Sequence, residues 1–147
     1  MRKSSLAILG TALLMFSVSA MAENSTAIGE YVIHHNAITT DNLSPQMASA
    51  YGLQRSKGRA MLNVSVIKGK QGRMGTPVAA KIDATTRNVI GQTSTIALRE
   101  VREGNAIYYI GDFPVAHRET LDFFLQVTPE GENSPFKAQL RQEFYTD

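Results

Sequence analysis

The sequence predicts an all-β fold: an antiparallel, immunoglobulin-like β-sandwich of about seven strands, with one short helix after the first strand. Apolar and polar residues alternate with period two, which is the pattern of strands that bury one face. These runs recur about every ten residues and are separated by turn-forming residues, as in sandwiches. A small closed barrel stays open as the alternative, because alternation does not distinguish two packed sheets from one closed sheet.

Residues 1–22 have the composition of a secretory signal peptide. A basic start precedes an apolar run over residues 6–18, and the small residues Ala20 and Ala22 follow it. The run has 13 residues, fewer than the roughly 20 that a membrane-spanning helix needs. We expect cleavage after Ala22, export to the periplasm, and a single domain over residues 23–147 without a transmembrane segment. The chain has no cysteine, so neither a disulfide nor a thiol-linked lipid can form.

Charge is unevenly distributed along the mature chain. Two of the 15 basic residues leave with the signal peptide, and 13 remain against 13 acidic residues. Between Arg55 and Arg87 there are eight basic residues and a single acidic one, Asp83. Such a segment fits an anionic partner, and it fits equally well a solvated surface whose charges pair across the fold. Nucleic acid is not expected as a partner, because the segment lacks interleaved aromatic residues for base stacking.

The first expected strand spans residues 28–38. The segment after this strand contains the only sequence pattern typical of a helix. Ser44 and Pro45 are typical of a helix start, since the hydroxyl can accept from first-turn N–H groups and proline needs no donor there. Gly52 is typical of a helix end. We expect the helix to cap an open end of the core. Its apolar face would consist of Met47, Ala50 and Tyr51.

Six further strands are expected after the helix. Their ranges are residues 60–67, 78–83, 95–101, 106–113, 119–128 and 136–145. The third and fourth of these form the clearest hairpin, because the residues Glu103, Gly104 and Asn105 between them are a tight-turn sequence. The inward side chains expected in the last two strands are Leu121, Phe123, Leu125, Val127, Phe136, Ala138, Leu140 and Phe144.

Three histidines are candidate metal ligands. His34 and His35 are adjacent in an expected strand, so their side chains point to opposite faces and do not easily share one ion. A copper or zinc site could instead combine one of them with His117 and a methionine, Met47 or Met61. The spacing does not require such a site, and packing or hydrogen-bonding roles are the simpler explanation of the histidines.

No catalytic motif is present. The chain has no Gly-x-Ser-x-Gly elbow and no cysteine nucleophile. Glu119 and Asp122 are three residues apart in an expected strand, so they face opposite sides and cannot act as a carboxylate pair. We therefore expect a non-enzymatic protein without a cofactor.

Four segments carry a resemblance to a known family: YVIHHNAITTDNLSPQMASAYGLQRSKGRAMLNVSVIK, VIGQ, IYYIGDF and LDFFLQVTPEG. With these segments the chain resembles a family of exported Gram-negative bacterial proteins known as domain of unknown function 4426, over nearly all of its mature length. The resemblance implies a periplasmic, all-β, immunoglobulin-like domain. It implies no activity, cofactor or catalytic residue. Its most specific residues are His35, Asn36, Leu43, Pro45, Ala50, Tyr51, Gly52, Arg55, Ser56, Lys57, Asn63 and Ser65.

Our hypothesis from the sequence is a binding or accessory module for an envelope protein or an anionic envelope component. Its working surface would combine the helical connection with the loop at residues 54–59. Tyr51 and Asn36 could instead simply lock this connection, because loops carry both structural and functional roles. The alternative hypothesis is a periplasmic copper or zinc carrier with His34, His35 and His117 as ligands. The candidate binding residues are His35, Asn36, Tyr51, Arg55, Lys57 and Arg59.

Overall fold

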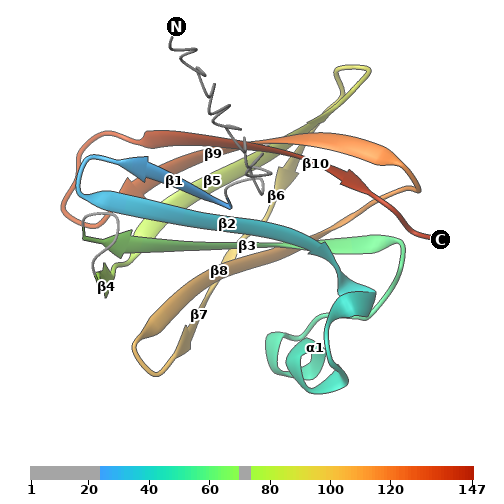
Figure 1. Ribbon diagram of the computed structural model, residues 1–147, viewed down its shortest axis with the longest axis horizontal. Coiled ribbons are helices and arrows are strands. Elements are labelled where there is room, and N and C mark those ends of the chain that lie inside the picture. The colour runs from blue at the N-terminus through green and yellow to red at the C-terminus, as the bar shows by residue number, and fades with distance from the viewer. Residues whose placement is uncertain (1–23, 70–73) are drawn as a thin grey trace, which may run out of the picture.

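The computed structural model describes residues 24–69 and 74–147, and the expected signal peptide lies outside these ranges. In the described residues the chain forms two antiparallel sheets and one short α-helix (Figure 1). The first sheet has the order β1–β2–β3–β8–β7, with β4 paired to the end of β3, and the second has the order β10–β9–β5–β6. The elements are β1 Ser25–Ile28, β2 Tyr31–Thr39, the 3-10 turn η1 Thr40–Asn42, α1 Pro45–Tyr51, β3 Arg59–Lys68, β4 Thr76–Pro77, β5 Ala80–Asn88, β6 Thr93–Ile96, β7 Arg99–Glu103, β8 Ala106–Pro114, β9 Glu119–Pro129 and β10 Phe136–Phe144.

The two sheets stay separate, so the chain is a β-sandwich and the barrel alternative is wrong. Over residues 24–69 and 74–147, the all-β, antiparallel prediction and the single short helix are confirmed. Strands are more numerous than expected, because two of the expected strands are each divided and the two-residue strand β4 was not predicted.

The first division falls within residues 28–38. Gly29 has a φ of +57°, and with Glu30 it forms a two-residue turn that joins β1 to β2. Tight hairpin turns need positive φ angles, which glycine adopts without steric cost. The helical connection consequently follows the second strand of the fold, and β1 adds an edge to the first sheet.

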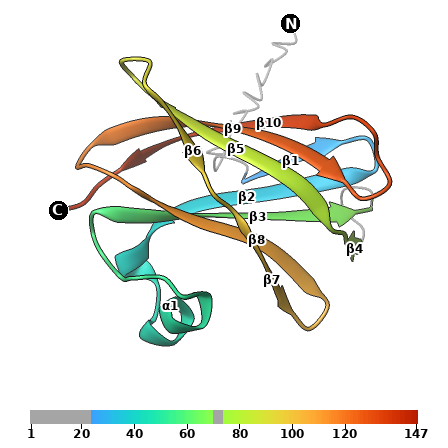
Figure 2. The ribbon, with the colours of Figure 1, turned by 180° about the vertical axis from the view of Figure 1, so that it is seen from behind.

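The second division falls within residues 95–101. β6 ends at Ile96 in the second sheet, and β7 begins three residues later in the first sheet (Figure 2). The crossing segment passes Gly111 of β8, where a Cβ atom would lie 2.9 Å from Ile96 Cγ2 and 3.0 Å from Leu98 Cδ2. Gly111 therefore makes room for the chain to change sheets.

The hydrophobic core lies between the sheets. Phe113 of the first sheet packs edge to face against Phe123 and Phe144 of the second, with ring centroids 5.4 and 5.9 Å apart. Phe123 and Phe144 are almost completely buried. The inward alternation predicted for β9 is confirmed, because Leu121, Phe123, Leu125 and Val127 are all buried.

The ends of helix α1 are those that the sequence predicts. The Ser44 hydroxyl accepts a hydrogen bond from the Met47 N–H at 3.1 Å, and Pro45 occupies the first turn. Gly52 closes the helix with a φ of +66°. These local signals succeed because each involves residues within one or two turns of the other.

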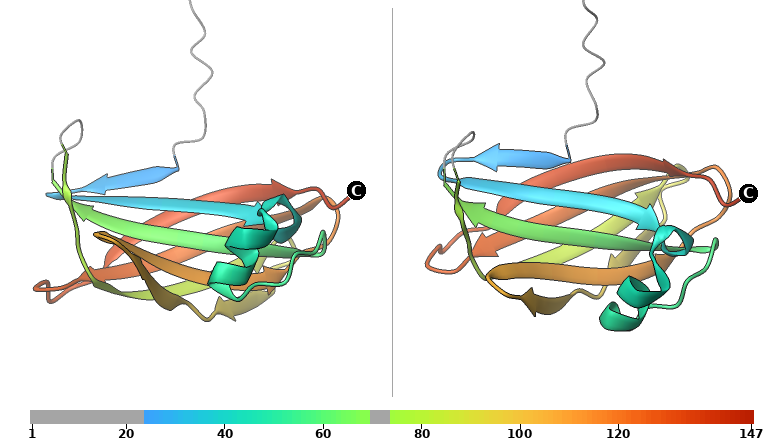
Figure 3. Two further views of the ribbon diagram at one scale, coloured as in Figure 1. Left: turned by 90° about the horizontal axis from the view of Figure 1, so that it is seen from below. Right: turned by 60° about the horizontal axis from the view of Figure 1, so that its bottom comes forward.

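The packing of α1 differs from the expectation. The helix lies on the outer face of the first sheet, turned away from the second, and does not cap the end of the core (Figure 3). Its buried residues are Ala48 and Tyr51, which pack with Met61 and Ile110 of the sheet. Met47, expected inside, is 45% exposed, and Ala50 is exposed as well. The helix buries a narrower stripe than the apolar spacing indicated.

Candidate binding surface at the helical connection

Thr40 holds the two ends of the helical connection together. Its side chain is completely buried, and its hydroxyl donates towards the Gln54 carbonyl at 2.8 Å and the Ser56 carbonyl at 3.1 Å. The same hydroxyl accepts from the Ser56 N–H at 2.9 Å. A buried hydroxyl with all its hydrogen bonds made stabilises one loop conformation. The loop after α1 is therefore fixed against the 3-10 turn before it.

Arg55 spans the same connection at the surface. Its Nε donates to the Leu43 carbonyl at 2.8 Å, and a terminal nitrogen donates to the Asp41 backbone carbonyl at 3.1 Å. Both acceptors are neutral, so they orient the guanidinium without cancelling its charge. In residues 24–69 and 74–147, neither Arg55 nor the exposed Lys57 takes part in an ion pair.

Tyr51 belongs to the support of this surface. The side chain is 8% exposed and packs in the small apolar cluster between α1 and the first sheet. Burial raises the pKa of Tyr51, and the nearby Glu103 carboxylate raises it further. The phenol is therefore neutral at physiological pH. This packing fits the locking role, one of the two interpretations of Tyr51 that the sequence left open, and a binding role for Tyr51 stays a prediction.

Arg59 links the connection to the neighbouring strand. Its Nε donates to Asp112 Oδ2 of β8 at 2.8 Å, and both side chains are about one-third exposed, at 36% and 34%. Solvent screening at this exposure makes the pair a weak contributor to stability. Its charge is balanced locally, unlike that of Arg55. Lys70 and Arg73, two other residues of the basic segment, lie outside the described residues.

His35 and Asn36 lie on opposite faces of β2. His35 is 3% exposed on the core side, where its Nε2 is 3.0 Å from Thr26 Oγ1 of β1. Burial lowers the pKa of His35, and its Nδ1 has no partner among the described residues. Asn36 is exposed on the outer face, opposite Asn63 of β3. Asn36 therefore lies on the face of the first sheet that carries α1, whereas His35 faces the core.

The residues of the metal hypothesis are not brought together. His34 is exposed on the outer face of β2, opposite to His35, as the strand period predicts. His117 lies in the loop after β8, where its Nδ1 accepts from the Thr146 N–H at 3.1 Å and its Nε2 is 3.4 Å from Asp147. Met61 is buried beneath α1, on the other side of the sheet from His35. Across the described ranges, no three His, Cys, Asp or Glu side chains form a group that could hold a metal ion.

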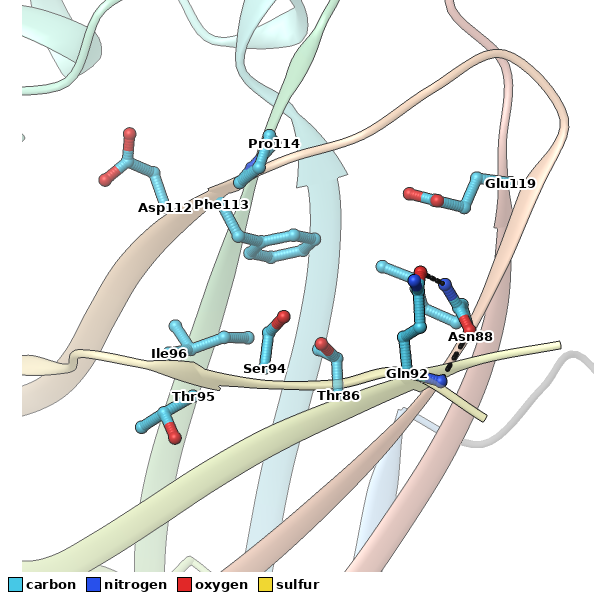
Figure 4. Close-up of a pocket in the computed structure, with 11 residues that line it drawn as sticks. Thr86, Asn88, Gln92, Ser94, Thr95, Ile96, Asp112, Phe113, Pro114 and Glu119 are labelled. Atoms are coloured by element: carbon cyan, nitrogen blue, oxygen red, sulfur yellow. Dashed lines mark hydrogen bonds between the residues drawn. The ribbon is translucent and has the colours of Figure 1, made fainter. Parts of the chain in front are cut away.

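A pocket beside the connection was not predicted from the sequence. It measures about 300 Å³ and lies where β6 and the end of β8 form the open side of the sandwich (Figure 4). Thr86 and Ser94 occupy inward positions of β5 and β6, and Figure 4 shows both side chains directed towards the pocket. Asp112 and Glu119 contribute carboxylates, and the lining includes no Lys, Arg or His. The sequence signal for this pocket is the presence of polar residues, Thr86 and Ser94, in expected or observed strands. The sequence does not say which face of these strands is inward, so the pocket could not be predicted from them.

Within the part of the chain that the structure describes, no helix is long and apolar enough to cross a membrane.

The comparisons with known proteins agree with the sequence resemblance. The profile of the family called Domain of unknown function (DUF4426) matches residues 25–147. The fold is similar to the crystal structure of a DUF4426 family protein from Pseudomonas aeruginosa PAO1, with 31% identity and a TM-score of 0.72. That match covers 86% of this chain and 97% of the other. No curated protein matches the chain.

Two structures of FetP from uropathogenic Escherichia coli strain F11 are similar at lower identity. The as-isolated protein, expressed recombinantly in the periplasm of E. coli, has 12% identity and a TM-score of 0.60, covering 84% of this chain and 94% of that one. A copper-bound variant of FetP has 10% identity and a TM-score of 0.58, covering 84% and 95%. At these identities the likeness shows a common fold alone.

Proposed function

This chain belongs to the DUF4426 family, and from that premise we propose that it is an exported, non-enzymatic binding module of the cell envelope. It docks an acidic protein or another anionic envelope component on the rim of the helical connection. We define this cationic rim by three residues, Arg55, Lys57 and Arg59.

The observation that carries the proposal is the way in which Arg55 is held. Two backbone carbonyls fix its guanidinium at the surface, and neither removes its charge. A pre-oriented side chain loses little conformational entropy when it binds a carboxylate or phosphate group. Lys57 adds a second cation two residues away, and Arg59 adds a third whose charge Asp112 partly balances. A cationic rim with an oriented guanidinium is suited to an acidic partner.

Export rests on the signal-peptide pattern of residues 1–22. The immunoglobulin-like arrangement of the strands belongs to this proposal as well. Its support is the pair of facing antiparallel sheets.

A photo-crosslinking residue at Gln54 tests the proposed docking surface. Gln54 is exposed and lies beside Arg55, so a partner on the rim should yield a discrete adduct from an envelope fraction. We expect the adduct yield to fall as salt rises, since exposed charge pairs are screened. In this background Lys57→Glu should lower the yield severalfold.

Lys137→Glu is the matched control, because it makes the same charge change at an exposed position of β10 in the other sheet. Equal yields in the two variants, or an adduct insensitive to salt, would show that the rim is not the docking surface.

The copper-bound FetP variant raises metal carriage as the alternative for this chain. Its proposed ligands here are His34, His35 and His117, which do not converge, so no observation in this fold favours that alternative. Metal analysis of protein purified from the periplasm without chelators tests it independently. A stoichiometric metal, or a melt raised by near-equimolar copper or zinc, would put metal carriage first. We expect neither.

A further inference from the structure

β6 presents an open hydrogen-bonding edge. In an antiparallel ladder, a residue directs its N–H and C=O to the same neighbour, and the next residue directs them to the opposite side. The Asn88 N–H bonds to the Gln92 carbonyl at 3.0 Å, so Gln92 and then Ser94 point their backbone groups towards β5. Thr93 and Thr95 therefore point theirs away from the sheet. In the described ranges, no strand pairs with β6 on that side.

This edge lacks the features that normally prevent strand pairing. Its sequence, Thr-Ser-Thr-Ile, has no charged residue and no proline. The other edge on this side of the sandwich, β7, carries charges at four of its five positions, Arg99, Glu100, Arg102 and Glu103. Charged side chains are a common protection of edge strands. β6 is therefore accessible to pairing where β7 is protected.

Among the strands that the structure describes, the backbone at the end of β8 is also unpaired on the side that faces β6. β7 pairs with β8 only as far as Ile110, and the crossing segment then passes Gly111, so in the described residues no strand pairs with the last part of β8 on that side. The polar pocket between β6 and β8 lies beside both edges (Figure 4). Ser94 points inward and is still exposed, because the pocket leaves it uncovered. Phe113 and Leu121 form apolar parts of its wall.

The charge of this pocket is negative. Asp112 is balanced by Arg59, whereas the Glu119 carboxylate has, among residues 24–69 and 74–147, the Ala116 N–H as its one hydrogen-bond partner, at 3.4 Å. The neighbouring His117 turns to the C-terminal residues and does not line the pocket. An incoming side chain that reaches Glu119 should therefore be cationic.

We propose that an extended segment of a partner protein adds to β6 as a strand and places one Lys or Arg side chain in the pocket against Glu119. Unpaired backbone donors and acceptors call for a polypeptide strand, and the carboxylate calls for a cation. A second copy of this chain fits less well, because its own β6 offers only Thr, Ser and Ile side chains. This surface differs from the cationic rim in charge and in its use of β6, and the Arg59–Asp112 ion pair lies between the two.

Capped seven-residue peptides of alternating Thr and Val with a central Lys or Glu test the proposal. We expect the Lys peptide to shift the amide resonances of Thr93–Ile96 and Glu119, and to bind about tenfold more tightly than the Glu peptide. Glu119→Gln should remove most of this preference. Equal binding of the two peptides would overturn the choice of a cationic occupant.

The pair Thr95→Pro and Thr95→Val tests strand addition itself. Proline removes the outward N–H, and valine keeps it, at a position whose groups do not bond to β5. The proline variant should lose peptide binding and the valine variant should retain it, with matching spectra for the rest of the fold. Equal binding by both variants would overturn strand addition.

Peptides N-methylated on alternate residues give a second measurement that needs no protein variant. Methylation of the peptide nitrogens whose N–H groups would bond to β6 should abolish binding. Methylation of the alternate nitrogens, whose N–H groups point away from β6, should not. Self-association of the unliganded protein through β6 would overturn the heterologous partner in favour of a second copy.

Discussion

The hydroxyl oxygen of Tyr109 accepts a hydrogen bond from the Ala80 N–H at 2.8 Å, which joins the two sheets. Tyr109 lies in β8 of the first sheet, and Ala80 begins β5 of the second. The ring is 8% exposed, and the hydroxyl also lies 3.4 Å from Glu100. Burial raises the pKa of Tyr109, so the phenol is neutral at physiological pH. The bond therefore joins the two sheets next to β7, the strand that carries Glu100.

Tyr109→Phe should lower the free energy of unfolding by about 1–2 kcal/mol, because the Ala80 N–H loses its partner while the ring packing is kept. Urea denaturation monitored by circular dichroism measures the change. Tyr108→Phe is the control, since the adjacent side chain faces the other side of the sheet. Equal effects of the two substitutions would show that the bond between the sheets contributes nothing.

His35 should make the fold sensitive to mild acid. Its pKa in the folded protein is lowered by burial, so between that value and the unfolded value of about 6.5 the unfolded chain binds more protons. The contribution of neutral His35 to the free energy of unfolding is thus fully present above about pH 6.5, and it is lost as the pH falls through the folded pKa. Denaturant unfolding between about pH 8 and pH 5 should show this decline, and His35→Gln should flatten it.

His34→Gln is the control for this pH dependence, because His34 is exposed on the outer face of the same strand. It should keep the decline of the original protein. The Asp122 carboxylate, whose pKa is lowered by its hydrogen bond to Arg141, loses its contribution only at lower pH. A decline that persists in His35→Gln would assign the sensitivity to other groups.

Thr40→Val should loosen the helical connection. Valine has the same shape but leaves the Ser56 N–H and two carbonyls without their buried partner, at a cost of about 1–3 kcal/mol. Amide hydrogen exchange should accelerate at residues 54–58 and stay slow in β9. The same substitution should also weaken crosslinking from the cationic rim, because Arg55 is held by this connection. Unchanged exchange at residues 54–58 would mean that Arg55 alone orders the loop.

Gly111→Ala should be destabilising by about 1–3 kcal/mol, because the new methyl group meets the crossing segment between β6 and β7. Gly58→Ala is the matched control. A Cβ at Gly58 has no neighbour closer than 3.8 Å, and the change there should stay within about 0.5 kcal/mol. Thermal melts of the two variants compare them directly. Similar melting temperatures would mean that the crossing segment moves aside without cost.

The features that the sequence predicts correctly are local. Alternation with period two identified the strands, and Ser44, Pro45 and Gly52 identified the ends of the helix, because strand period and helix caps depend on residues close in the chain. The opposite directions of His34 and His35 follow from the same period. The family resemblance was also visible in the residues themselves and is confirmed by the match over residues 25–147.

The features that only the tertiary structure decided depend on residues distant in the chain. Arg55 belongs to a fixed connection because carbonyls 12 and 14 residues earlier receive its hydrogen bonds. The strand expected at residues 95–101 changes sheets because Gly111 leaves space for it. The polar pocket exists because inward positions of β5, β6 and β9 meet the end of β8. Alternation says which residues share a face, but only the packing of two sheets decides which face is buried and where the core stays open.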